Sequence, residues 1–232
     1  MATYPFKIVF LTGAGISAPS GIPTYRDSDG LWQDKATQHL ASAEALYYDT
    51  ASFLDFFNKQ RMLVSQAQSN EAHRMIAELE HCYPVTVITQ NIDDLHERAG
   101  STNVIHVHGE LTKVCSSENR CDEDCIEEFP LSEPIKLGQK AKDGSQLRPS
   151  VVLFGEYVDT SKAKRPLQEA DILVIVGTSL KVFPAASLWR ECHHLIPKFH
   201  INPSPSDNPE FINIAEDAIK GLKIFKKELF KL

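Results

Sequence analysis

The sequence predicts an α/β fold in which a doubly wound parallel sheet carries a second, smaller module. Short apolar, β-branched runs recur along the 232 residues, and several are apolar on both faces, as strands are in a parallel sheet covered by helices. Helical patterns lie between many of these runs, and such alternation is typical of a doubly wound fold. Two stretches, residues 33–68 and 112–148, break the alternation and are interpreted as insertions.

The individual elements follow from the same patterns. Strands are expected at residues 8–11, 85–89, 104–107, 151–154, 172–176 and 199–201. Helices are expected at residues 70–82, 93–99 and 185–195; Gly100 is a good stop for the second, and Pro184 is a common start for the third. The first insertion carries candidate helices at 41–46 and 53–64, whereas the second is polar, poorly periodic and holds three cysteines.

Composition and net charge exclude several classes to which the protein could belong. Hydrophobic residues at 42% and charged residues at 24% are ordinary for a globular chain. The net charge of −7 argues against non-specific nucleic-acid binding, which needs a basic face. No apolar run approaches the roughly 20 residues that span a bilayer, and the first residues lack a signal-peptide pattern. Five cysteines, an odd number, suit a reducing compartment, so we expect a cytoplasmic protein with no nucleic-acid or membrane partner.

A glycine-rich turn follows the first predicted strand. Residues 13–18, Gly-Ala-Gly-Ile-Ser-Ala, satisfy the pattern G-x-G-x-x-G/A, in which glycines permit a tight turn and a close approach to phosphate groups. An ordinary strand-to-helix turn would also explain the pattern. Pro19, Gly21 and Pro23 then interrupt the expected helix. No second strand ends in an acidic residue about 20 positions later, so the ribose of a bound nucleotide must be held in another way.

Polar residues follow three further predicted strands. Gln90, Asn91 and Asp93 follow the strand predicted at residues 85–89. Ligands of open α/β sheets bind at the carboxyl ends of strands. The amide and carboxylate groups of these three residues suit a ribose or a carboxamide, although Asn91 or Asp93 could equally cap the next helix. The small polar stretches 177–179 and 202–204 suit contacts with a nucleotide, or are plain turns.

Two histidines, His106 and His108, are expected on one face of the third strand, because side chains alternate along a strand. His108 comes last, before Gly109, at the mouth of the sheet, where a neutral imidazole is suited to act as a general base. The alternatives are a packed, hydrogen-bonded histidine or a pair of metal ligands, but no third ligand lies nearby in the sequence.

Five stretches together resemble the sirtuin family of NAD-dependent protein deacylases, in particular its bacterial-type, single-domain members. They are GAGISAPSGIPTYRDSDGLW, TQNIDDLHERAG, HVHGEL, LRPSVVLFGE and VGTSLKVFPAASL; they occur in the family's order and cover nearly the whole chain. The resemblance implies a Rossmann-like NAD-binding domain made of residues 1–32, 82–111 and 149–232. It also implies a small domain made of the helical insertion 33–81 and the cysteine-containing insertion 112–148.

The same resemblance implies the site residues. The catalytic residues would be His108 and Asn91. NAD would be bound by Gly13, Ala14, Gly15, Ser17, Tyr25, Arg26, Trp32, Gln90, Asn91, Ile92, Asp93, Gly177, Thr178, Ser179, Asn202, Pro203, Ser204 and Ala218. An acyl-lysine protein or peptide would add as a strand between residues 153–156 and 180–183, with contacts from Val152, Phe154, Gly155, Glu156 and Val182. Residues 19–32 would form a flexible loop that folds over NAD.

The reaction that the resemblance implies consumes NAD. Nicotinamide leaves the ribose, and the carbonyl oxygen of the acyl-lysine attacks the carbon that it left. His108 then deprotonates a ribose hydroxyl, and water completes the release of lysine, with O-acyl-ADP-ribose as the other product. Such chemistry needs a dry pocket and an oriented base.

The sequence departs from the family where many members hold zinc between two C-x-x-C pairs. Glu118 stands where the partner of Cys115 would be, and Lys140 and Asp143 stand where the second pair would fall. A structural zinc site needs four ligands. We therefore expect no zinc, the alternative being an irregular site built from Cys115, Cys121 and Cys125.

A second departure concerns the acyl group. Members that remove succinyl or malonyl groups carry Tyr-x-x-Arg in a small-domain helix, and Phe57 and Gln60 align with that pair. Without the arginine, an acidic acyl group loses a charged hydrogen-bond partner worth about 1.5–3 kcal/mol. Arg61 lies one position further, about 100° round the helix. We therefore expect a deacetylase, or an enzyme that acts on other uncharged acyl groups.

Three other functions stay open at this point. They are a protein mono-ADP-ribosyltransferase that uses the same cleavage of NAD, a hydride-transferring dehydrogenase, and a non-catalytic module that binds NAD or a peptide. The missing acidic residue and the polar stretch 90–93 count against the dehydrogenase.

Overall fold

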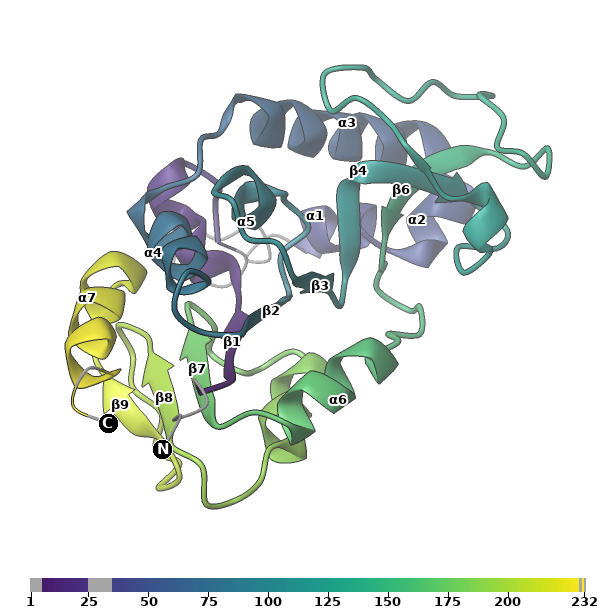
Figure 1. Cartoon of the computed structure of the whole chain (residues 1–232). Coiled ribbons are helices and arrows are strands. Elements are labelled where there is room, and N and C mark those ends of the chain that lie inside the picture. The colour runs from purple at the N-terminus through teal and green to yellow at the C-terminus, as the bar shows by residue number, and fades with distance from the viewer. Residues whose placement is uncertain (1–5, 25–34, 230, 232) are drawn as a thin grey trace.

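The computed structural model describes residues 6–24, 35–229 and 231, and its larger part is a six-stranded parallel sheet (Figure 1). In spatial order the strands are β3 (Val104–His106), β2 (Val85–Thr89), β1 (Ile8–Thr12), β7 (Ile172–Val176), β8 (Lys198–Ile201) and β9 (Ile212–Ile214). β1 pairs with β2 on one side and with β7 on the other. The strand order therefore reverses between β1 and β7, the place where open α/β sheets bind ligands. The predicted doubly wound fold is confirmed.

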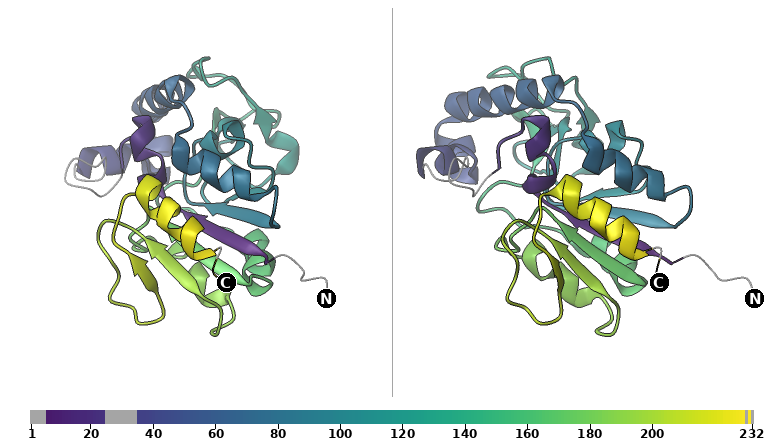
Figure 2. Two further views of the ribbon diagram at one scale, coloured as in Figure 1. Left: turned by 60° about the vertical axis from the view of Figure 1, so that its left-hand side comes forward. Right: turned by 90° about the vertical axis from the view of Figure 1, so that its left-hand side faces the viewer.

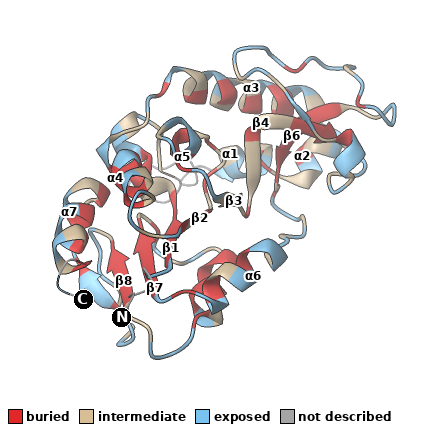
Figure 3. Ribbon diagram, in the orientation of Figure 1, coloured by how far each residue is buried: buried red, intermediate tan, exposed pale blue. Residues whose placement is uncertain are grey.

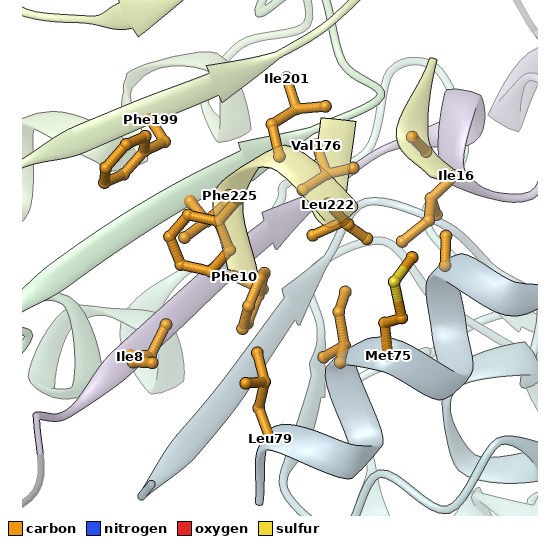
Figure 4. Packing of buried hydrophobic residues seen from close by; sticks show 14 of the residues in the cluster. Ile8, Phe10, Ile16, Met75, Leu79, Val176, Phe199, Ile201, Leu222 and Phe225 are labelled. Atoms are coloured by element: carbon orange, nitrogen blue, oxygen red, sulfur yellow. The ribbon is translucent and has the colours of Figure 1, made fainter. Parts of the chain in front are cut away.

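Helices cover both faces of this sheet, as strands that are apolar on both sides require (Figure 2). On one face lie α4 (Glu71–Leu79) and α7 (Ala218–Leu229), and Phe225 of α7 meets Phe10 of β1 edge to face at 6.0 Å (Figure 4). On the other face lie α6 (Ser161–Gln168) and the 3-10 helix η5 (Ala185–Glu191). A short helix, α5 (Leu95–Arg98), follows β2.

A second core lies beside the sheet and is built from both insertions. Helices α1 (Lys35–Leu40), α2 (Ala43–Tyr48) and α3 (Thr50–Gln66) accompany an antiparallel sheet of β5 (Glu127–Glu128), β4 (Gly109–Ser116) and β6 (Leu147–Val151). Phe53 and Phe57 of α3 are buried in one cluster with Leu111, Val114 and Leu147 of that sheet, and Figure 3 shows the buried positions on α3 and β6. Two segments far apart in the sequence therefore share one core.

One predicted strand is wrong. Residues 151–154 form no strand beyond Val151, where β6 ends, and the sixth strand of the main sheet is β9, which the sequence analysis missed. The run is apolar because Leu153 is buried in the second core. The Phe154 N–H donates to Ala41 O, and the Phe154 carbonyl accepts from the Ala43 N–H, both at 3.0 Å, so this backbone pairs with the first insertion instead.

The predicted helices are mostly present, with shifted ends. Asn70 caps α4, its side chain accepting from the Ala72 N–H at 2.8 Å. Gly100 follows α5 with a φ of +104°, so the predicted stop is confirmed. η5 is a 3-10 helix and not the α-helix expected there, and Pro184 is its N-cap. Among the described residues, no helix combines the length and apolar character needed to cross a membrane.

Candidate cofactor and substrate cleft

A cleft of about 720 Å³ opens at the carboxyl ends of β1, β2, β7 and β8 and extends to α3 and the end of β6. Most of the residues that the sequence singled out line it: Gly13, Ala14, Gly15, Gln90, Asn91, Ile92, His108, Val152, Phe154, Gly155, Glu156, Gly177, Thr178, Ser179, Val182, Asn202, Pro203, Ser204 and Ala218. Ser17 and Asp93 are buried and bond to Asn91 or to each other. Tyr25, Arg26 and Trp32 lie outside the described residues.

Part of the wall was missed by the sequence analysis. Ala41, Phe56 and Asp217 also line the cleft. Asp217 could have been found from the sequence, because it directly precedes α7 and aspartate is a common residue at the start of a helix. In the structure its carboxylate accepts a hydrogen bond from a main-chain N–H of that helix at 2.9 Å. Ala41 and Phe56 carried none, since apolar residues in a helical insertion are ordinary core residues.

Glycines at the ends of β1 and β7 allow two turns to touch backbone to backbone. A Cβ on Gly15 would lie 2.7 Å from the Cα of Gly177, and a Cβ on Gly177 would lie 2.5 Å from the N of Ile16. Gly177 also has a φ of +64°, which favours glycine. After Gly13 the chain forms two 3-10 turns, η1 (Ala14–Ile16) and η2 (Ala18–Ser20), so the predicted interruption of the helix is confirmed.

Ser17 joins this glycine turn to the end of β2. Its Oγ donates to Asp93 Oδ2 at 2.9 Å and accepts from Asn91 Nδ2 at 3.1 Å, and Asn91 Nδ2 also donates to Gly13 O at 3.2 Å. Burial raises the pKa of Asp93, although its hydrogen bonds to Leu95 and Ser17 oppose the rise. Asn91 Oδ1 is buried and has no hydrogen-bond partner among the described residues. An unpaired buried acceptor beside a cleft favours a ligand that can donate to it.

His108 lines the cleft with one ring nitrogen already engaged. The carbonyl oxygen of Gln90 lies 2.9 Å from Nδ1, and a carbonyl only accepts, so Nδ1 carries the proton. Nε2 therefore holds the free lone pair, and no residue that the structure describes bonds to it. Burial lowers the pKa of His108 below 6.5 against the opposing effect of the Gln90 bond, so the ring is neutral at pH 7. This is the state that a general base requires.

His106 and His108 do not lie on one strand, so the prediction that they share a strand face is wrong. β3 ends at His106, so the strand alternation does not continue. His106 Nε2 lies 2.8 Å from Glu97 Oε1, and Nδ1 lies 3.1 Å from Asn91 O. Burial alone would lower the pKa of His106, but the hydrogen bond and charge of Glu97 outweigh it and raise the pKa. His106 is thus a packed and paired histidine.

The stretch after β6 is fixed by an ion-pair cluster. Glu156 accepts from the fully buried Arg148 at 2.5 Å and from the Leu153 N–H at 2.9 Å, and Arg120 lies 3.4 Å from it. The main-chain groups of Leu153 and Phe154 are therefore used within the protein. On this side, the main-chain groups left for a peptide begin at Gly155, later than the start of the predicted stretch 153–156.

α3 presents Phe57 and Gln60 to the cleft, one helical turn apart. The side-chain amide of Gln60 makes no hydrogen bond among the described residues. Arg61 points away, as its helical position predicts: it is fully buried, and its guanidinium donates to the carbonyl oxygens of Leu111 and Pro130. Burial lowers the pKa of Arg61 to about 10, opposed by Glu133, so Arg61 stays charged at pH 7.

The cysteines of the second insertion do not fit a zinc site. Cys115 is buried in β4 with its Sγ 3.7 Å from Pro149 O, Cys125 ends the 3-10 helix η4 (Glu123–Cys125), and Cys121 is exposed. Burial raises the pKa of the Cys115 and Cys125 thiols. In the described part of the chain, no group of three or more His, Cys, Asp or Glu is arranged to hold a metal ion.

A hydroxyl and a carboxylate join the loops of this insertion instead. Ser116 Oγ donates to Asp143, lies 2.9 Å from Ser145 Oγ, and accepts from the N–H groups of Glu118 and Asn119, both at 3.0 Å. Asp143 Oδ1 accepts from the Ser145 N–H at 2.9 Å. The hydrogen bonds from Ser116 and Ser145 lower the pKa of Asp143. We call this group the Ser116–Asp143 cluster.

An open sheet with a glycine turn at the point where its strand order reverses, and a neutral histidine in the same cleft, define an enzyme of the Rossmann-like, nucleotide-binding class. Comparison with known proteins gives the family. The model of the Sir2 family matches residues 13–184, and the chain belongs to this family, the sirtuins. The predicted resemblance is confirmed.

Similar proteins cover nearly all of the chain. An NAD-dependent protein deacylase of Bacteroides thetaiotaomicron is 47% identical over 207 residues, which are 87% of this chain and 87% of the relative. An NAD-dependent protein deacylase of Helicobacter pylori is 41% identical over 232 residues, 97% of this chain and 98% of the relative. Among solved structures, a Sir2 homologue in complex with NAD has a TM-score of 0.83 at 36% identity, covering 97% of this chain and 90% of that chain.

Proposed function

We propose that this chain is an NAD-dependent protein-lysine deacylase, acting as a deacetylase, which produces nicotinamide and O-acyl-ADP-ribose. The observation that carries the proposal is the neutral ring of His108, whose Nδ1 is engaged by Gln90 and whose Nε2 is free in a cleft that begins at a glycine turn. Relatives that are 47% and 41% identical are named NAD-dependent protein deacylases, which supports the activity.

The cleft fits a dinucleotide. The main-chain N–H groups of Ala14, Thr178 and Ser179 line it and make no hydrogen bond among the described residues, so they are available to phosphate oxygens. Residues 202–204 and Ala218 would flank the adenosine, and the relative solved with NAD supports this use of the fold. NAD, when bound, supplies a ribosyl carbon that accepts the acyl oxygen as nicotinamide leaves.

Residues of the chain itself would carry out proton transfer, hold the nicotinamide end of NAD and exclude water. Nε2 of His108 would take the proton of a ribose hydroxyl, and Asn91 would offer its unpaired Oδ1 to the nicotinamide end of NAD. Ser17 and Asp93 would hold Asn91 and the pocket around it. Ile92 and Phe57 would exclude water from the reacting carbon.

The acyl-lysine would enter from the side of α3 and the loop after β6. Its peptide would pair with main-chain groups from Gly155 onward and with residues 180–183, where Val182 lines the cleft. The acyl group would lie near Phe57 and Gln60, which carry no charge, while Arg61 is bound to carbonyl oxygens elsewhere. We therefore propose a preference for acetyl and other uncharged acyl groups.

Three further assignments belong to this proposal. The NAD-binding domain would consist of residues 1–32, 82–111 and 149–232, and the small domain of residues 33–81 and 112–148. The two separate cores support this division.

The protein would contain no zinc, supported by the Ser116–Asp143 cluster where other members hold the metal. Five free thiols support a cytoplasmic location. Stoichiometric zinc in the purified protein would contradict the second assignment.

The deciding experiment is mass spectrometry of the products formed from NAD and a panel of acyl-lysine peptides. We expect nicotinamide, deacylated peptide and O-acyl-ADP-ribose in equal amounts, and none without peptide. His108→Ala should lower the rate by about 100-fold or more, because it removes the base, whereas the exposed-histidine control His81→Ala should not. ADP-ribose retained on protein without free deacylated lysine would instead indicate the mono-ADP-ribosyltransferase, which the names of the relatives do not favour.

A further inference from the structure

One arginine of the second insertion reaches out of its own loop to the wall of the cleft. Arg120 lies between β4 and η4, and its side chain is 18% exposed. Its Nε lies 3.4 Å from Glu156 Oε2, and its guanidinium also donates to the carbonyl oxygen of Tyr157 at 2.9 Å. Arg120 does not itself line the cleft, so its effect on a ligand must pass through these two partners.

The partners of Arg120 belong to the stretch on which we propose that the peptide binds. Gly155, Glu156 and Val158 of this stretch line the cleft. The N–H groups of Gly155 and Tyr157 and the carbonyl oxygen of Glu156 make no hydrogen bond among the described residues. An extended peptide can therefore pair with them. Arg120 bonds directly beside the main-chain groups that such a peptide would use.

The beginning of this stretch is fixed by other contacts, but its end is not. The main chain of Phe154 pairs with the first insertion, and the carboxylate of Glu156 accepts from the fully buried Arg148. For the main chain of Tyr157, the bond from Arg120 is the one hydrogen bond that the described residues provide. The position of residues 157 and 158 therefore depends on the second insertion.

The loop that carries Arg120 is itself held in place. In the Ser116–Asp143 cluster the serine hydroxyl accepts from the N–H groups of Glu118 and Asn119, both at 3.0 Å. The carbonyl oxygen of Asn119 accepts from the Asp122 N–H at 3.3 Å. Arg120 thus lies in a turn whose main chain is bonded on both sides of it. Its planar guanidinium can then bond to two acceptors at once with little further loss of side-chain freedom.

We propose that Arg120 is a positioning residue for the acyl-lysine peptide: through it, the second insertion holds residues 155–158 in the conformation with which the peptide pairs. This inference rests on the proposed function, which assigns that side of the cleft to the peptide. Loss of the guanidinium frees the Tyr157 carbonyl and removes one of the partners of Glu156, whereas the glycine turn and the residues after β2 keep all their bonds. Peptide binding therefore weakens, and NAD binding does not change.

The test compares Arg120→Ala, Arg120→Lys and the control Lys113→Ala in the full chain. We expect Arg120→Ala to raise the KM for acetyl-lysine peptide by about fivefold, the size of one hydrogen bond, with the KM for NAD unchanged. Arg120→Lys keeps the charge but cannot bond to both acceptors in the same way, so the rise should be about twofold. Lys113 is a partly buried cation of the same insertion, paired with Glu110 at 2.7 Å. Lys113→Ala should leave both KM values unchanged.

Hydrogen exchange without NAD or peptide separates this inference from the proposed function. The N–H groups of Leu153 and Glu156 are bonded within the stretch, and Arg120→Ala should speed their exchange by about fivefold, whereas Lys113→Ala should not. A wild type that removes no acyl group refutes the proposed function, and the exchange rates still decide whether Arg120 holds the stretch.

Three outcomes would overturn the inference. They are an unchanged KM for peptide in a folded Arg120→Ala, an equal rise in Arg120→Ala and Lys113→Ala, and unchanged exchange of the Leu153 and Glu156 N–H groups. If Arg120→Ala does not fold, Arg120→Lys against Lys113→Arg provides the same comparison.

Discussion

We expect the free nitrogen of His108 to govern how the reaction depends on pH. Burial lowers the pKa of His108 below 6.5, and a general base acts only in its unprotonated form. The value of kcat/KM should therefore be constant around neutral pH and should fall on acidification, with a midpoint below 6.5. A profile of kcat/KM for an acetyl-lysine peptide over about pH 5–9 measures this, because kcat/KM reports the free enzyme. A midpoint above 6.5 would contradict the assigned state of the ring.

We propose that Gln60 and Phe57 decide which acyl group is accepted, so exchanging them should change the preferred acyl group. We expect the double variant Phe57→Tyr, Gln60→Arg to raise kcat/KM for succinyl-lysine peptide by about tenfold or more, because a charged hydrogen bond contributes about 1.5–3 kcal/mol. The rate with acetyl-lysine peptide should fall. Lys59→Arg, an exposed change on the same helix that leaves the ion pair with Asp55 possible, is the control. No gain in succinyl-lysine turnover would refute the role of these two residues.

The loops of the second insertion depend on the Ser116–Asp143 cluster for their stability. Ser116→Ala leaves two main-chain N–H groups without their acceptor, at a cost of about 1–3 kcal/mol if they stay buried. We expect a lower melting temperature than for Ser117→Ala, whose neighbouring hydroxyl takes no part in the cluster. Chelators should change neither value. A melting temperature of the wild type that falls on removal of zinc would show that the cluster is not what holds these loops.

The same cluster should weaken in acid. The pKa of Asp143 is lower in the folded protein than the ordinary 3.8, so its contribution is complete above that value and is lost as the pH falls towards the folded pKa. The difference in melting temperature between wild type and Ser116→Ala should shrink over that range. A constant difference down to about pH 3 would contradict the role of the Asp143 carboxylate.

Elements with strong apolar runs or clear end signals were predictable, and the others were not. β1, β2 and β7 consist of apolar residues and threonine, and Asn70 and Gly100 mark the start and end of helices. α6 was missed because Pro166 lies inside it, and β5 because its two glutamates show no alternation. Within the site, motif residues were found by type and spacing. The hydrogen bond between Ser17 and Asp93 was not predicted, because it is a tertiary contact that no local pattern reveals.

Arg61 connects the two insertions within the second core. It lies on α3, and its guanidinium donates to Leu111 at β4 and to Pro130 in the long loop that follows β5. Arg61→Met keeps most of the volume but leaves these carbonyl oxygens without their charged donor, so we expect the free energy of unfolding to fall by about 3 kcal/mol. Urea unfolding measures this, with Lys59→Met on the exposed side of α3 as the control. Equal stabilities would show that the insertions hold together without Arg61.

The contact between the turns of Gly15 and Gly177 also bears on the making of the protein. A ribosome releases Gly15 early and Gly177 only after 162 further residues, the difference between the two positions. Until then β1 lacks one of its two neighbours, and the glycine turn has nothing to close against. A nascent chain therefore cannot consume NAD before most of it has left the ribosome. The formation of the last strands is the step that completes the enzyme.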